Sequence, residues 1–87
     1  MNVNYTKRFK KAYKKLSEND QDKVDQAIIL LMMNHNDPNL RNHSVSPKYL
    51  ECRSIDAWFD LRILLKTLDD YENVSLVTLW SHSQLYG

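Results

Sequence analysis

The sequence has very little glycine, proline or cysteine. Gly87 is the only glycine, so a glycine-rich phosphate-binding loop is excluded. Cys52 is the only cysteine, which excludes an intramolecular disulfide, and together with scattered histidines it gives no zinc-ligand spacing. No serine lies in a nucleophile-elbow motif. We therefore expect a protein with no metal and no other cofactor, built from regular elements joined by short connections.

Long apolar runs are also missing. No run approaches the roughly 20 residues that cross a bilayer, and the first residues lack the apolar segment of a secretory signal. A single cysteine agrees with a reducing compartment. With 87 residues, the chain is long enough for one domain, 1–87, and too short for two. These features predict a cytoplasmic protein that does not contact a membrane.

The formal charge is only +1, but the charges are unevenly distributed. The first fifteen residues contain six cations and no acid, whereas residues 16–25 contain four acids and one lysine. A basic segment of this kind can contact phosphates or an acidic partner. A solvated helix face explains the same pattern equally well. The candidate phosphate contacts of this segment, which would include RNA, are Lys7, Lys10, Lys11 and Lys14.

The first half of the chain predicts a short strand followed by two helices. Residues 1–5 alternate weakly, and Thr6 can cap a helix of about ten residues. Its apolar positions, Phe9, Ala12, Tyr13 and Leu16, have the spacing of one buried helix face. Ser17 begins a second helix with an acidic first turn, and Asp37-Pro38 lies in the loop that follows it. We expect these two helices to form a hairpin.

After residue 40 the apolar period changes from 3.6 to 2, which predicts strands over 48–54, 58–66 and 74–80. Phe59, Leu61, Ile63 and Leu65 should form one apolar face of the middle strand. Arg53 and Arg62 should lie together on the opposite, polar face. The expected fold is α+β, in the order β-α-α-β-β-β, with the helical hairpin on one face of a small antiparallel sheet. The other face is then available for function.

The polar residues after position 40 suit chemistry on RNA. Cleavage without a metal needs a base for the 2′-hydroxyl, a cation for the phosphate and an acid for the leaving oxygen. His43 and His82 can supply the base and the acid, Arg53 and Arg62 can grip phosphate, and Asp60 can orient a neighbour. The structural alternative is that the arginines pair with nearby acids and only hold the surface together. His35 has no assigned role.

Three segments resemble the YafQ branch of RelE-type toxins. They are Leu40-Arg41-Asn42-His43, the run Asp60-Leu61-Arg62-Ile63-Leu64-Leu65 after Arg53, and the tail Trp80-Ser81-His82-Ser83-Gln84-Leu85-Tyr86-Gly87. The resemblance implies a RelE-like fold and ribosome-dependent cleavage of messenger RNA, neutralised by a partner antitoxin. It makes His82 and His43 the acid–base candidates and Asp60 the family's strand aspartate. Arg53 and Arg62 match its basic positions, Tyr86 its terminal aromatic, and Tyr49 is a further candidate RNA contact.

Two positions depart from the YafQ pattern. Asp56 stands where such toxins have a second histidine, and Thr78 stands where they have an arginine on the last strand. The departures favour an alternative on the same scaffold: a catalytically weakened toxin, or a ParE-like protein directed at DNA gyrase that acts as a protein-binding module. The two histidines favour the nuclease. A nucleic-acid-binding regulator is a third class and depends on the basic first helix alone.

Overall fold

A computed structural model describes residues 1–46 and 51–81, and it confirms the predicted α+β class. Within these two ranges the chain forms eight elements: β1 (Asn2–Tyr5), α1 (Lys7–Lys14), α2 (Glu18–Met33), the 3-10 helix η1 (Pro38–Leu40), β2 (His43–Ser44), β3 (Cys52–Asp56), β4 (Leu61–Lys66) and β5 (Asn73–Ser81). The strands form one five-stranded sheet in the order β1-β5-β4-β3-β2. None of the helices in the described ranges is long and apolar enough to cross a membrane.

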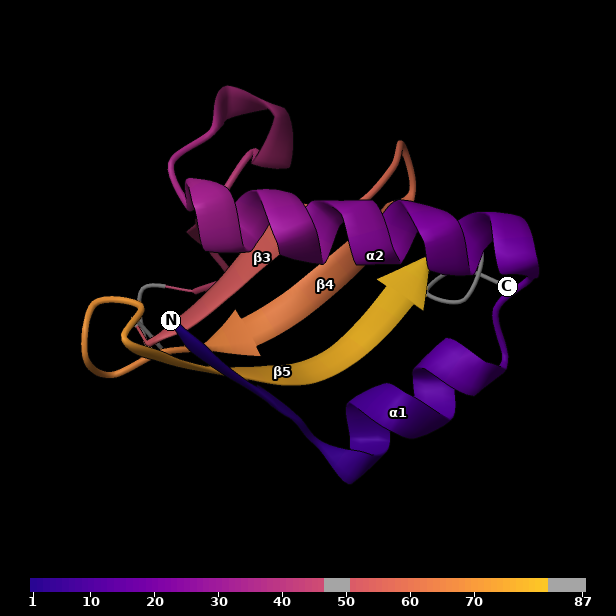
Figure 1. The fold of residues 1–87 in the computed structure, drawn as a ribbon, viewed down its shortest axis with the longest axis horizontal. Helices are drawn as coiled ribbons and strands as arrows, with labels where there is room; N and C mark the ends of the chain where they lie inside the picture. The colour runs from indigo at the N-terminus through magenta and orange to yellow at the C-terminus, as the bar shows by residue number, and fades with distance from the viewer. Residues whose placement is uncertain (47–50, 82–87) are drawn as a thin grey trace.

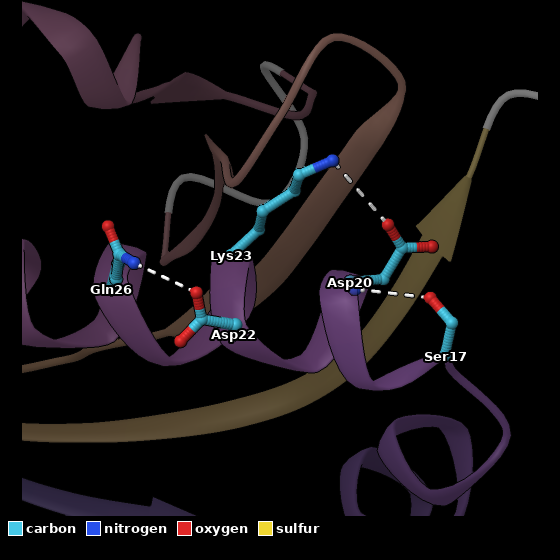
Figure 2. Close-up of polar contacts among 5 residues, drawn as sticks. All are labelled: Ser17, Asp20, Asp22, Lys23 and Gln26. Carbon is cyan, nitrogen blue, oxygen red and sulfur yellow. Dashed lines mark hydrogen bonds and ion pairs between the residues drawn. The ribbon is translucent and has the colours of Figure 1, made fainter.

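Both helices begin at the predicted caps. The Thr6 hydroxyl accepts a hydrogen bond from the Phe9 N–H, and the Ser17 hydroxyl accepts one from the Asp20 N–H at 3.2 Å. Such caps satisfy backbone donors that have no partner within the helix. Figure 2 shows the Ser17 cap beside the Lys23–Asp20 ion pair of the first turns of α2. The helix ends at Met33, before the predicted Asp37-Pro38 loop.

The predicted helical hairpin is present, and side chains join its two arms. The Tyr13 hydroxyl of α1 donates a 2.8 Å hydrogen bond to Asp25 of α2, while the Gln21 amide donates to the Tyr13 carbonyl. The hydrogen bond to a carboxylate raises the pKa of Tyr13 above its usual 10.0. The α1–α2 angle is therefore fixed by polar contacts as well as by Phe9, which is buried in the core.

In Figure 1, α2 crosses in front of β3, β4 and β5 while α1 lies beside β5, and residues of both helices share one core with the strands. Val24, Ala27, Ile28 and Leu31 of α2 face the apolar side chains of the strands. The strand residues of the core alternate with period 2 within each strand, as the pleat requires, except between Leu76 and Leu79 of β5. They are Ile55, Leu61, Ile63, Leu65, Val74, Leu76 and Leu79. We call the opposite side of the sheet, turned away from the helices, the outer face.

The sheet differs from the predicted one in three ways. It is mixed, because β1 pairs with β5 in parallel while the other pairs are antiparallel. The short strand β2 was not predicted. Residues 57–60 form a bend rather than the start of the predicted 58–66 strand, so Phe59 is 88% exposed and does not belong to the apolar face. The alternation of side chains alone does not distinguish a strand from the hairpin turn that precedes it.

A bulge in β5 also corrects the predicted faces of the 74–80 strand. Leu64 pairs with Thr78 and Leu65 with Leu76, so the residue between them in β5, Val77, has no partner in β4. An extra residue shifts the alternation by one position. Leu79 therefore lies in the core with Leu76, whereas the unbroken alternation placed them on opposite faces. The bulge thereby moves Trp80 to the outer face.

Candidate functional site

The outer face is built from transverse rows of side chains, because residues paired across antiparallel strands point to the same side. One row runs from Asp56 in β3 through Arg62 in β4 to Trp80 in β5. The next row contains His43, Ser54, Leu64 and Thr78. Two of the predicted site residues, His43 and Arg62, thus lie on one face in neighbouring rows.

Asp56 connects two arginines at the end of this face. Its two carboxylate oxygens lie 3.5 Å from Arg62 Nε and 3.5 Å from Arg41 Nη1. The Asp56 side chain is 12% exposed, whereas those of Arg62 and Arg41 are 37% and 71% exposed. A mostly buried carboxylate therefore holds two guanidinium groups that both reach solvent. We call Arg41, Asp56 and Arg62 the arginine bridge.

The contacts of His43 favour one tautomer. Its Nδ1 lies 2.6 Å from the carbonyl oxygen of Arg41. A carbonyl can only accept a hydrogen bond, so Nδ1 carries the proton and the neutral ring has an unprotonated Nε2. The side chain is exposed. His43 is thereby oriented with an unprotonated Nε2, which is what a general base requires.

Arg53 lies on the wrong face for the predicted pair of arginines. It pairs with the core residue Leu65, so it points toward the helices, whereas Arg62 points away from them. Its guanidinium donates to Asn42 Oδ1 at 2.6 Å and also contacts the Asn42 carbonyl and Ser44. Asn42 in turn donates to the hydroxyl of Tyr71. The prediction of one polar face carrying both arginines is wrong, because the β3–β4 register pairs Arg53 with the core residue Leu65 and puts Cys52 and Ser54 on the outer face.

The polar contacts of Arg53 belong to a cavity beneath the end of α2. Asn42 also donates to the His35 carbonyl, and the ring of His35 stacks on Tyr71 with the centroids 3.9 Å apart. His35, which the sequence left without a role, therefore closes one wall of a polar cavity that Arg53 and Asn42 also line. These interlocked hydrogen bonds connect the 34–42 loop to the sheet.

The remaining predicted site residues are not brought to the outer face together. Asp60 is exposed in the 57–60 bend and is not on the strand with Arg62, so it does not occupy the strand position that the resemblance gave it. His82, Tyr86 and Tyr49 lie outside the described residues. The candidate lysines of α1 are all exposed, but their helix belongs to the layer on the other side of the sheet. They are Lys7, Lys10, Lys11 and Lys14.

Two members of the site were missed in the sequence, Arg41 and Trp80. Arg41 lies in an irregular segment without periodicity, and the bulge reverses the face expected for Trp80. Within residues 1–46 and 51–81, no group of three or more His, Cys, Asp or Glu side chains could hold a metal ion. The described part of the site offers two arginine cations held by one carboxylate, further hydrogen-bond donors and one imidazole.

Comparison with known proteins gives structural matches only, since no family model and no curated protein matches the sequence. YafQ from Escherichia coli BL21(DE3) superposes with a TM-score of 0.77 at 18% identity, covering 99% of this chain and 98% of YafQ. The E. coli DinJ–YafQ toxin–antitoxin complex gives 0.78 at 18% identity, with 99% and 97% covered. A copper-bound mutant toxin from Helicobacter pylori gives 0.73 at 27% identity, with 98% of both chains covered. The chain therefore has the fold of YafQ and of the RelE/ParE toxin superfamily over its full length.

Proposed function

We propose that this protein is the toxin of a type II toxin–antitoxin system and that it cleaves messenger RNA on the ribosome without a metal. The observation that supports this proposal is the shared outer face of His43 and Arg62 on a sheet that superposes on YafQ over the whole chain. The DinJ–YafQ complex supports a cognate antitoxin as a second partner. His82 follows two residues after Trp80, the last residue of the Asp56–Arg62–Trp80 row.

In this mechanism each group has a separate task. The unprotonated Nε2 of His43 takes the proton of the 2′-hydroxyl, and Arg62 stabilises the charge on the pentacoordinate phosphate. His82 protonates the leaving 5′-oxygen, and Tyr86 stacks on a base. The 2′-oxygen forms a bond to phosphorus as the bond from phosphorus to the 5′-oxygen breaks. The products are a 2′,3′-cyclic phosphate and a free 5′-hydroxyl.

A weakened or gyrase-directed toxin is the second candidate, and the environment of Thr78 favours it. Thr78 is only 5% exposed and pairs with Leu64. This position therefore holds no cation where the resemblance expects an arginine, and the loss of one preorganised charge costs on the order of 10²- to 10³-fold in rate. The chain would then act through protein contacts, including its antitoxin.

Inducible expression in bacteria tests the proposal. The wild-type chain should arrest growth and create new messenger RNA 5′ ends, and His82→Ala should lower cleavage by about 10²- to 10⁴-fold because it removes the general acid. His35→Ala is the matched control, since it deletes an imidazole that stacks on Tyr71 away from the outer face. It should leave cleavage near the wild-type level.

Two results contradict the nuclease, and a third contradicts only the role of His82. Growth arrest without new RNA ends supports the protein-binding alternative, and no arrest despite soluble, folded protein contradicts a toxin of either kind. Equal cleavage by wild type and His82→Ala removes His82 from the mechanism.

A further inference from the structure

We propose that the arginine bridge is a phosphate-binding site for the RNA backbone, in which Arg41 contributes a contact that neither the sequence pattern nor the resemblance assigns. The proposal rests on the nuclease function above and names the group that replaces the missing cation at position 78. Arg41 and Arg62 each bind a phosphate oxygen, and Asp56 holds the two guanidinium groups in place. Arg41 and Arg62 contact the ligand, and Asp56 is a positioning residue.

The backbone of Arg41 is fixed on both sides. It has a left-handed conformation (φ 47°, ψ 46°) at the end of η1, which is uncommon for a residue other than glycine. Its N–H donates to the Pro38 carbonyl, and its own carbonyl accepts the proton of His43 Nδ1. Continuing the β2–β3 register by two residues from the His43–Ser54 pair places Arg41 level with Asp56. The strained backbone thus directs a long cation to the end of the outer face, next to the proposed base.

The arginine bridge has unused binding capacity. Each guanidinium has five N–H donors, and the ion pair with Asp56 involves one nitrogen of each. Two cations and one carboxylate leave a net charge of +1, which one phosphodiester neutralises. Guanidinium groups bind phosphate oxygens in pairs, so two of them side by side suit one or two neighbouring phosphates. The exposure of Arg41 and Arg62 leaves these donors accessible.

A second observation points to a ligand that supplies acceptors. Two buried donors on this face, Ser54 Oγ and Trp80 Nε1, have no hydrogen-bond partner in the described part of the chain, and the buried Arg62 Nε meets Asp56 Oδ1 only across the 3.5 Å ion pair. Ser54 is only 3% exposed. Three of these groups can donate, so the region has more donors than acceptors. Buried polar groups are normally paired, and unpaired ones in a native fold mark a place where a partner is missing.

Arg53 does not compete for this role. Each of its three guanidinium nitrogens already donates to Asn42 or Ser44, and it faces the helices. Lys66 provides a matched control, because it is an exposed cation on the same face of β4 but pairs with Cys52 and Ser75 at the other end of the strand.

The experiment measures binding without cleavage. A fluorescein-labelled RNA oligonucleotide with 2′-O-methyl groups at every position cannot be cut, and its fluorescence anisotropy with the full chain gives Kd over a range of salt concentrations.

Each phosphate contact contributes about 0.7 to the slope of log K against log salt for a single strand. Arg41→Ala should flatten the slope by about this amount and raise Kd about tenfold. Arg41→Lys should restore the slope but only part of the affinity, and Lys66→Ala should match wild type.

Asp56→Asn tests the positioning role. It adds a net positive charge, so tighter binding would show that Asp56 only neutralises the arginines and would overturn the bridge. We expect weaker binding, because both guanidinium groups lose their anchor. Thermal melts of every variant exclude unfolding as the cause.

The outcomes separate this inference from the proposed nuclease. An unchanged slope and Kd in Arg41→Ala overturn the phosphate site even if messenger RNA is cleaved in a His82-dependent way. The flattened slope supports the site even if no new RNA ends are found in cells, in which case only the nuclease proposal fails.

Discussion

At the scale of single residues, one carboxylate organises the turn between β4 and β5. Asp69 accepts hydrogen bonds from the Asn73 side chain at 2.7 Å, the Asn73 N–H at 2.9 Å and the Thr67 hydroxyl at 3.3 Å. These donors, the Asn73 side chain first, lower the pKa of Asp69 below its ordinary 3.8. The next two residues, Asp70 and Tyr71, have left-handed backbones with φ values of 54° and 71°, which this turn requires.

The first prediction concerns this carboxylate. Because its folded pKa is lowered, its contribution to stability is complete above pH 3.8 and disappears as the pH falls through the lower folded value. Asn73→Ala should move the pKa of Asp69 upward, toward 3.8, in an NMR titration of the side-chain carboxyl. Asn4→Ala, an exposed amide on β1, should leave it unchanged. An unshifted Asp69 in Asn73→Ala would refute the assigned cause.

The strand position of each arginine also decides which of them can meet a substrate. Arg53 and Arg62 look equivalent in the sequence, yet the register of β3 and β4 sends them to opposite faces. Arg62 keeps exposed donors, whereas those of Arg53 are used by Asn42 and Ser44. A salt-dependence measurement should therefore respond to Arg62→Ala in the same direction as to Arg41→Ala.

At the scale of elements, the start of α1 is joined to the bulge of β5. The Thr6 hydroxyl accepts a hydrogen bond from the Phe9 N–H at 3.1 Å. Its oxygen also lies 2.7 Å from the carbonyl oxygen of Leu76 and 3.0 Å from that of Val77, to which the hydroxyl donates. One hydroxyl thus caps a helix and shares its proton between the carbonyls of the bulge residue Val77 and its neighbour Leu76. The cap therefore connects the two layers at their edge.

Removing that hydroxyl should destabilise the fold. Thr6→Ala should lower the free energy of unfolding by about 1–2 kcal/mol, the usual cost of a lost N-cap. Thr6→Ser, which keeps the hydroxyl, should recover most of this loss. Urea denaturation followed by circular dichroism gives both values. Equal losses in the two variants would assign the effect to the methyl group and contradict the capping role.

At the scale of the whole molecule, apolar side chains are divided between a one-sided core and the surface. Ile63 is 0% exposed between the sheet and α2, whereas Phe59, four residues earlier, is 88% exposed. Both were predicted to share one apolar strand face. The bend at residues 57–60 separates them.

This division predicts that truncation to alanine lowers stability strongly at a core position and very little at a surface position. Ile63→Ala should cost about 2–5 kcal/mol of stability through lost burial and the cavity left behind. Phe59→Ala should change stability by no more than about 0.5 kcal/mol, as expected for a surface position. The same urea titrations measure both. A loss above 2 kcal/mol for Phe59→Ala would show that the bend is wrong and that the strand extends to Phe59.

The sequence by itself determined the local features of this protein. Caps at Thr6 and Ser17, the apolar stripe of each helix and the loop at Asp37-Pro38 depend on neighbours a few residues apart, so their patterns are readable directly. The α+β class follows from the change of period after residue 40. His43 and Arg62 were also recognised as site candidates from residue type and alternation.

Only the tertiary structure decided which side chains meet. The parallel β1–β5 pair, the bulge at Val77 and the register of β3 depend on contacts between distant segments, and a shift of one residue reverses a strand's faces. This is why Arg53 lies on the helix side of the sheet instead of in the predicted site, and why Trp80 lies on the outer face. Arg41, in an irregular segment with no period to read, reaches Asp56 only because η1 and β2 bring it level with the end of β3.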